Sequence, residues 1–271
     1  AHALDLRNQP DADIQQGLLA VPQMVLPSEH SRAIYQRGQS LGRDGAAVLR
    51  IGDCNSVSSF FLATFTDQDD VDLGAYTYLS DSLTHFAGSF DAVPVAADVG
   101  FNAFSVFDPF WADAEHCAAN ETPLDCALRR DNPAVAMIMF GANDVRVLNT
   151  EQYESALRMI IERMLDGGVI PVLSTFPNNP DIGDRGHIAL RFNAIVVALA
   201  SEYDVPLMNF WLMSQSLPGY GIADDNAHLT VRGPTEGFAE DAVQRWGFSA
   251  RNLLALAMLD QLLDNVITDS N

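Results

Sequence analysis

Short apolar runs alternate with amphipathic stretches along most of the chain. The runs lie at 46–51, 93–99, 134–140, 169–176 and 205–210. Each run is nearly continuous rather than alternating, which is typical of parallel strands that are buried on both faces. Strands and helices in alternation, joined by right-handed crossovers, predict a parallel sheet with helices on both sides. The pattern therefore indicates an α/β fold.

Helical periodicity fills the gaps between these runs. Apolar side chains recur on one helical face after Thr150, the expected N-cap, and the pattern ends at Gly167-Gly168. Two further helices are predicted at 187–203 and 250–266. We expect the last of these to pack on the sheet.

The first 44 residues differ from the rest of the chain in being polar and rich in Pro and Gly. They predict an N-terminal arm, 1–44, that packs on the domain and includes a short helix at 31–37. With 271 residues and 48% hydrophobic side chains, the remainder can bury one full core. We expect a single domain over 45–271. Arg50 lies inside its first strand, where a charge requires a partner, and we expect an acidic neighbour.

The charge of the chain is strongly negative. Its formal net charge is -21, and all of its 15 basic residues are arginine. Such a surface repels phosphate backbones and anionic headgroups, which argues against nucleic-acid and membrane-surface partners. No apolar run approaches the ~20 residues of a membrane-spanning helix, so we expect a soluble protein. The oligomeric state does not follow from the sequence.

Three cysteines are present, and two of them, Cys117 and Cys126, lie close together in a polar stretch. We expect a disulfide between them, with two free surface thiols as the alternative. A bridge over so short a loop stabilises by roughly 2 to 3 kcal/mol and persists outside the reducing cytosol. A secreted or extracellular protein is therefore expected, and a chain that starts without Met fits a processed product. The cysteines are too scattered for a zinc site, and we expect neither metal nor cofactor.

Polar residues gather in four loops at the ends of predicted strands. The loops span 52–56, 100–102, 141–144 and 224–228. Ligand sites of parallel α/β sheets lie beyond the carboxyl ends of the strands. Acyl transfer requires a nucleophile, a base, a group that orients the base, and hydrogen-bond donors for the oxyanion. These loops supply all four.

The loops also carry the ordered motifs of a known family, and the chain resembles the SGNH (GDSL-like) hydrolase/esterase superfamily. The family's blocks Gly-Asp-Ser, Gly, Gly-x-Asn-Asp and Asp-x-x-His correspond here to Gly52-Asp53-Cys54, Gly100, Gly141-Ala142-Asn143-Asp144 and Asp225-Asn226-Ala227-His228. The resemblance implies a flavodoxin-like, three-layer α/β/α sandwich with about five parallel strands. It also implies esterase activity, as an acyl-ester hydrolase or acyltransferase, on small acyl esters or acylated glycans, and we expect no cofactor.

One residue departs from the family pattern, because Cys54 stands where the nucleophilic serine is usual. The resemblance implies that Cys54 is the nucleophile, His228 the base and Asp225 the residue that orients the imidazole. Backbone N–H groups of Cys54 and Gly100, with the Asn143 amide, then form the oxyanion hole. Gly100 and Asn143 also suit ordinary turns.

Other interpretations of these residues stay open at this level. Cys54 follows a strand and opens a helix, so we expect its thiolate to be favoured, yet a free cysteine is more often a small buried hydrophobe. Asp224 is the alternative to Asp225 as the orienting carboxylate. Asp53 and Asp144 are interpreted as structural residues that hold their loops. A catalytically impaired SGNH-like domain that binds an acylated or plain glycan is the alternative function.

Overall fold

The structure is a computed structural model that describes residues 6–67, 71–233, 237–238 and 241–268. At its centre lies a five-stranded sheet in the order β1-β5-β4-β3-β2. The strands are β1 (Met24–Val25), β2 (Asp44–Gly52), β3 (Pro133–Met139), β4 (Ile170–Ser174) and β5 (Leu207–Met208). Strands β2 to β5 are parallel, and β1 pairs with β5 in the antiparallel direction.

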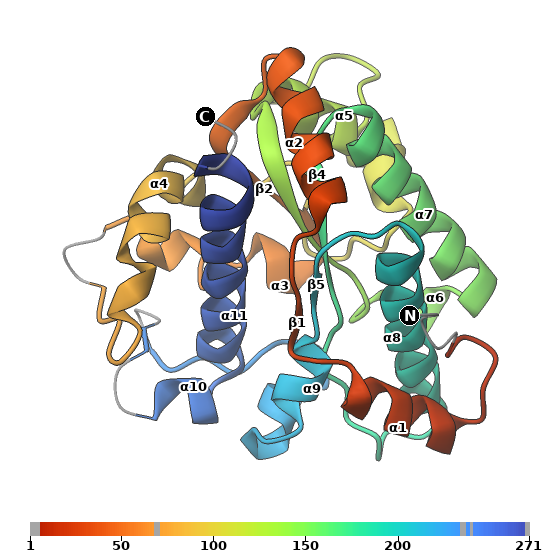
Figure 1. The fold of residues 1–271 in the computed structure, drawn as a ribbon. Helices are drawn as coiled ribbons and strands as arrows, with labels where there is room; N and C mark the ends of the chain where they lie inside the picture. The colour runs from red at the N-terminus through yellow and green to blue at the C-terminus, as the bar shows by residue number, and fades with distance from the viewer. Residues whose placement is uncertain (1–5, 68–70, 234–236, 239–240, 269–271) are drawn as a thin grey trace.

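Helices cover both faces of this sheet. Figure 1 shows α2 and α11 on one side and α7 and α8 on the other. The helices are α1 (Asp11–Ala20), α2 (Glu29–Ser40), α3 (Cys54–Val57), α4 (Ser80–Phe90), α5 (Pro123–Arg130), α6 (Asp144–Val147), α7 (Thr150–Asp166), α8 (Asp184–Glu202), α9 (Phe210–Ser214), α10 (Ala242–Arg245) and α11 (Gly247–Leu262). Every residue of β3 is buried, which explains its uninterrupted apolar sequence. The predicted α/β class is confirmed.

The predicted strand at 93–99 is wrong in extent. This segment forms a single parallel bridge, between Ala97 and Gly52, at the edge of the sheet beyond β2. Pro94 has no N–H to donate to a ladder, and the side chains of Val93 and Val99 are 52% and 68% exposed. An apolar run thus lies partly in solvent instead of forming a buried strand.

The N-terminal segment contains more structure than the expected arm with one short helix. Both α1 and α2 form here, and β1 extends the sheet through the pairs Met24–Met208 and Val25–Leu207. Helix α1 packs on α8, with Ile14 fully buried. None of the helices in the described ranges combines the length and apolar character needed to cross a membrane.

The cap of α7 differs from the prediction by one residue. Asn149, not Thr150, is the N-cap: its side chain accepts from the N–H of Gln152, and the Gln152 side chain accepts from the N–H of Asn149. This reciprocal capping box satisfies two otherwise unpaired donors. The helix ends at Asp166, before the predicted glycine pair.

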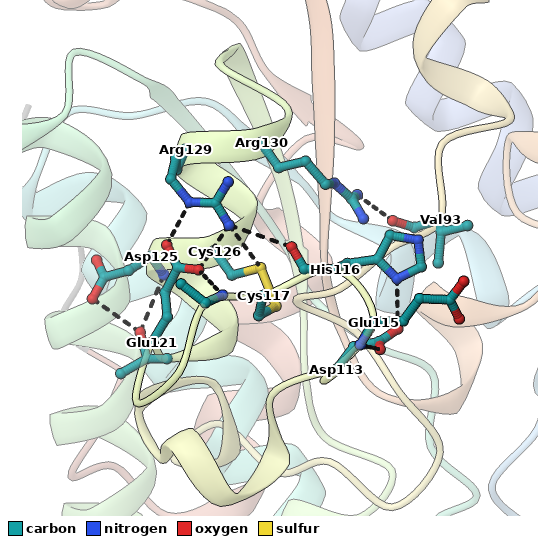
Figure 2. The surroundings of a disulfide bond; sticks show 12 residues. Val93, Asp113, Glu115, His116, Cys117, Glu121, Asp125, Cys126, Arg129 and Arg130 are labelled. Carbon is teal, nitrogen blue, oxygen red and sulfur yellow. Dashed lines mark hydrogen bonds and ion pairs between the residues drawn. A yellow bond between two sulfur atoms is a disulfide. The ribbon is translucent and has the colours of Figure 1, made fainter.

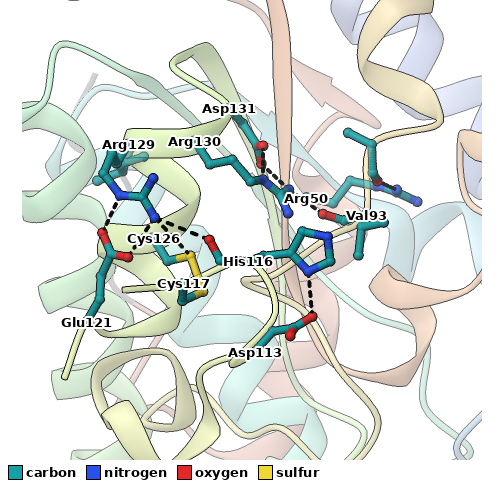
Figure 3. Close-up of polar contacts among 12 residues, drawn as sticks. Arg50, Val93, Asp113, His116, Cys117, Glu121, Cys126, Arg129, Arg130 and Asp131 are labelled. Carbon is teal, nitrogen blue, oxygen red and sulfur yellow. Dashed lines mark hydrogen bonds and ion pairs between the residues drawn. A yellow bond between two sulfur atoms is a disulfide. The ribbon is translucent and has the colours of Figure 1, made fainter. Parts of the chain in front are cut away.

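Arg50 is buried, but its hydrogen-bond partners are not acidic. Its guanidinium donates to the carbonyls of Phe61 (3.0 Å) and Ala92 (2.6 Å). Burial lowers the pKa of Arg50 to about 10, while the negative charges of Asp131 and Asp91 oppose this shift. Figure 3 shows Asp131 bound instead to Arg130. The expected acidic neighbours are therefore Asp131 and Asp91, which act through their charge, while loop carbonyls accept the hydrogen bonds.

The disulfide between Cys117 and Cys126 is present, and Cys54 is free and buried. The bond joins the loop before α5 to the helix itself. Arg129 lies beside it and donates to the Glu121 carboxylate (2.8 Å) and to the His116 carbonyl (3.3 Å), as Figure 2 shows. These contacts hold together the long loop that follows residue 102.

Candidate active site

The nucleophile position lies in a tight turn between β2 and α3. Asp53 is the N-cap of α3, and its Oδ1 accepts the N–H of Asn55 at 3.0 Å. Gly52 is required before it, because a Cβ there would lie 2.3 Å from Met139 O and from Ser56 Oγ. Cys54 is the first helical residue, and its side chain is buried.

The surroundings of Cys54 disfavour its thiolate. Burial raises the pKa of the Cys54 thiol to about 12, and the negative charge of Asp53 adds to this effect. The sulfur lies 3.9 Å from Asp53 Oδ1. The expectation of a favoured thiolate is therefore wrong, because a helix of four residues offers little dipole against burial and an adjacent carboxylate. The group is a neutral thiol at pH 7.

The His228 loop is a compact turn that orients the imidazole. An antiparallel bridge between Ile222 and Leu229 closes it. Asp225 Oδ2 lies 2.6 Å from His228 Nδ1, and Asp225 Oδ1 accepts the N–H groups of Ala227 and His228. Burial raises the pKa of Asp225, but these hydrogen bonds outweigh it and lower the pKa to about 2. Nε2 of the half-exposed ring then faces away from the carboxylate as an acceptor.

Asp225, rather than Asp224, is the carboxylate that contacts the imidazole. Asp224 takes part in the same turn through its carbonyl, which accepts from Asn226 Nδ2 at 3.3 Å. Both aspartates are exposed residues of one loop. The structure thus distinguishes between two residues that the sequence left as alternatives.

Asn55 connects the Cys54 turn to the His228 loop. Its Nδ2 donates to Ala227 O at 3.0 Å, and its Oδ1 accepts the Leu229 N–H at 3.0 Å. The residue after Cys54 is thus bound to both chain neighbours of His228. Asn55 was not predicted as a site residue; its position directly after the proposed nucleophile is the signal in the sequence, whereas its burial is seen only in the structure.

A buried arginine supports the same turn from the C-terminal helix. Arg251 donates to Asn55 O (2.6 Å) and to Ser56 Oγ (3.0 Å), and its guanidinium lies 3.6 Å from the centre of the Phe61 ring. Burial lowers the pKa of Arg251 to about 9, and the negative charge of Asp53 acts in the opposite direction. Asp53 and Arg251 therefore offset each other's charge in the interior. Arg251 was not predicted as a site residue from the sequence either.

Gly100 and Asn143 lie close to each other. Gly100 has a φ of +87°, a conformation that favours glycine, and its N–H has no hydrogen-bond partner within the described part of the chain. Asn143 Nδ2 donates to the carbonyl of Phe101, the next residue, at 2.9 Å. The Asn143 amide retains a second hydrogen for another acceptor. Within the described residues, Gly100 and Asn143 thus each retain an N–H group for a ligand.

Asp53 and Asp144 join the loops that carry these groups. Asp53 Oδ2 accepts the N–H of Ala142 (3.2 Å), and Asp144 Oδ1 accepts the N–H of Ala103 (2.8 Å). The second Asp144 oxygen is buried and unpartnered within the described ranges. Burial, and then the charge of Asp53, raise the pKa of Asp144 to about 7. The contacts agree with the structural role expected for both aspartates.

Potential metal ligands do not gather at these loops in the described residues. Within the described residues, one group of three such side chains has its ligand atoms within 4.8 Å of one another. This group consists of Cys117, Glu121 and Cys126. The disulfide uses both sulfurs, and Arg129 binds the carboxylate. This cluster is therefore a structural feature of the loop.

Comparison with known proteins places this geometry in a family. The model of the GDSL-like lipase/acylhydrolase family matches residues 92–234, slightly more than half of the chain. The chain belongs to this family. The matched region contains Gly100, Asn143, Asp225 and His228, while the Cys54 turn lies outside it.

Individual proteins similar to this GDSL-like chain cover different shares of it. The thioesterase 1/protease 1/lysophospholipase L1 of Escherichia coli (strain K12) is 30% identical over 106 residues, which are 39% of this chain and 50% of the relative. The chain thus matches about half the length of this curated relative. The lipase/acylhydrolase of Enterococcus faecalis superposes with a TM-score of 0.49 at 14% identity, covering 79% of this chain and 94% of its own. The psychrotrophic esterase EstA from Pseudoalteromonas sp. superposes with a TM-score of 0.45 at 18% identity. This match covers 82% of this chain and 96% of the esterase.

Proposed function

We propose that this protein hydrolyses acyl esters through Cys54, His228 and Asp225. In this proposal the oxyanion is bound by the N–H groups of Cys54 and Gly100 and by the Asn143 amide. Family membership supports the hydrolase class. The main support is the 2.6 Å contact between Asp225 and His228, in a loop that Asn55 binds directly to the Cys54 turn.

The reaction begins with a neutral thiol, as it would with a serine hydroxyl. His228 Nε2 takes the proton from Cys54 Sγ while the sulfur forms a bond to the ester carbonyl carbon. The oxyanion then collapses, the bond from carbon to the alcohol oxygen breaks, and His228 protonates that oxygen. Water, deprotonated by His228, cleaves the thioester, which releases the acid and restores the thiol.

The charge on Asp225 stabilises the imidazolium that forms in each of these steps. Its pKa of about 2 keeps it ionised throughout the neutral range. Because Asp225 accepts the Nδ1 proton, the tautomer with a basic Nε2 is selected before substrate binds. We propose small acyl esters or acylated glycans as substrates. A location outside the reducing cytosol, which the disulfide supports, stays a prediction.

One observation favours a second function, the binding of an acylated or plain glycan without turnover. Cys54 replaces the family's usual serine, and its thiol has a pKa raised to about 12, far from that of an activated cysteine. A binding site, however, does not require an oriented imidazole. The retained contact between Asp225 and His228 therefore favours the hydrolase.

Hydrolysis of p-nitrophenyl acetate and butyrate by three proteins tests the proposal: wild type, Cys54→Ala and Cys54→Ser. We expect turnover by the wild type and a loss of at least about 10³-fold in kcat for Cys54→Ala, as for removal of other nucleophiles. Cys54→Ser measures how far the site still suits a hydroxyl. Activity found in Cys54→Ser alone would instead identify a disabled site and support the binding function.

A further inference from the structure

A cavity of about 300 Å³ lies at the β2 edge of the sheet, next to the proposed reaction centre. Its wall includes Val57, which lies three residues after Cys54 and thus on the same face of α3. It also includes Asp98 and Phe101, on either side of Gly100. The cavity therefore adjoins both the nucleophile turn and a proposed oxyanion donor.

The inner wall of the cavity carries apolar side chains, and polar atoms share its lining. Val95 and Phe101 are buried, and Trp111 closes the outer side with its ring 5.7 Å from that of Phe101. Two carboxylates, Asp98 and Asp113, lie in the wall where it reaches the surface. An apolar chain suits this interior, while the two negative charges disfavour an anionic group.

The cavity is built from segments that other contacts hold in place. Figure 3 shows Arg130 donating to the carbonyl of Val93, at one end of the wall, and His116 Nδ1 bound to Asp113 (2.9 Å) at the other. The disulfide follows His116 directly. Because its loops are already ordered by these contacts, the cavity can select a ligand by size.

We propose that this cavity holds the acyl group of the substrate, and that it accepts a short, apolar chain without a negative charge. The inference rests on the proposed hydrolase function and adds where the acyl chain binds and what limits its length. A volume of about 300 Å³ is at the small end of ligand pockets. Val57 and Trp111 are then the residues that determine chain length.

The test compares p-nitrophenyl acetate, butyrate and octanoate with wild type, Val57→Phe and Trp111→Ala. Val57→Phe fills the cavity, so we expect the ratio of kcat/KM for butyrate to kcat/KM for acetate to fall about tenfold or more. Trp111→Ala opens the wall of the cavity. We expect it to raise kcat/KM for octanoate about tenfold relative to kcat/KM for butyrate. Phe110→Ala is the matched control, since Phe110 is 82% exposed and touches Trp111 outside the cavity.

If all variants hydrolyse acetate and show the same dependence of kcat/KM on acyl chain length, the proposed role of the cavity is refuted, while the proposed hydrolase function stands. Should wild type hydrolyse no ester, binding of butyramide decides separately. Butyramide binding is measured by tryptophan fluorescence. The signal of Trp111 is the change that wild type shows and Trp111→Ala lacks. A saturable change that Val57→Phe abolishes supports the cavity, and no change refutes it.

Asn55 supports a second inference, which rests on hydrogen bonds rather than on the cavity. Its two side-chain groups bind the carbonyl of Ala227 and the N–H of Leu229, so they fix the backbone on both sides of His228. Arg251 in turn binds the Asn55 carbonyl. We infer that Asn55 is a positioning residue, which keeps the imidazole directed at Cys54. This inference also rests on the proposed function.

A matched control exists for the test of Asn55. Asn252 is equally buried and makes the same pair of bonds, accepting the Leu62 N–H (3.0 Å) and donating to Phe60 O (2.7 Å). Asn55→Ala and Asn252→Ala should therefore lower Tm similarly. Only Asn55→Ala is expected to lower kcat, by about 10- to 100-fold at nearly unchanged KM, because the base is misplaced.

Equal kcat values for the two variants would refute the positioning role. NMR of the His228 ring protons gives an answer that does not depend on turnover. We expect altered ring-proton shifts for His228 in Asn55→Ala but not in Asn252→Ala. Unchanged His228 signals in both variants would equally refute the inference.

Discussion

Replacing His228 by alanine is expected to lower kcat/KM for p-nitrophenyl butyrate by about 10³ to 10⁵ at pH 7. The reason is the pKa of about 12 for the Cys54 thiol. Without a base, only about one thiol in 10⁵ is ionised at that pH. An enzyme with a preformed thiolate would depend far less on its histidine as a base.

The pH dependence of the His228→Ala variant gives the sharper result. Below the pKa of the thiol, each pH unit raises the thiolate fraction tenfold, so log kcat/KM should rise with a slope of about one between pH 7 and 10. His187→Ala is the matched control, because His187 Nδ1 lies 2.6 Å from Asp11 in an exposed pair. It should behave as wild type. A flat profile in His228→Ala would show that His228 is not the base.

Replacing Asp225 by alanine is expected to lower kcat/KM by about 10³-fold, while Asp224→Ala changes it less than about threefold. Asp225 receives the Nδ1 proton of His228 at 2.6 Å and two backbone N–H groups. Its loss removes the charge that stabilises the imidazolium and frees the ring to adopt the other tautomer. Asp224 carries the same charge in the same loop.

Steady-state kinetics with p-nitrophenyl butyrate, together with Tm for each variant, measures this difference. Asp225 also organises its turn, so Asp225→Asn is included because its amide oxygen can still accept the backbone N–H groups. We expect Asp225→Asn to retain Tm and to remain strongly impaired. Similar losses in the Asp224 and Asp225 variants would show that the loop's general charge, not the contact, is responsible.

Local sequence patterns predicted much of the fold. The continuous apolar run at 134–140 became the fully buried β3, and the glycine pair after Asp166 ended α7 as expected. Both features depend on neighbouring residues, since burial on two faces and helix termination are encoded over a few positions. The run at 93–99 failed as a strand because its burial depends on its place at the sheet edge.

For the candidate site too, some features follow from local sequence and others depend on the tertiary structure. The order of the motifs, and the placement of Cys54 and Asn143 in loops after β2 and β3, follow from the sequence, because loops after parallel strands lie at one edge. The protonation of Cys54 does not follow, and the expected thiolate was wrong. The pKa of a thiol depends on its burial and on charges from distant segments, which no local pattern contains.

By itself, the sequence determined the α/β class, the family motifs and the short disulfide, because each depends on residues that are close in the chain or on strand order. Only the tertiary structure decided between Asp224 and Asp225, and only it showed Asn55 bound to the His228 loop and Arg251 bound to the Cys54 turn. These last two contacts join residues more than 170 positions apart. Such pairs meet only when the packed core brings α3, α11 and the loop before α10 together.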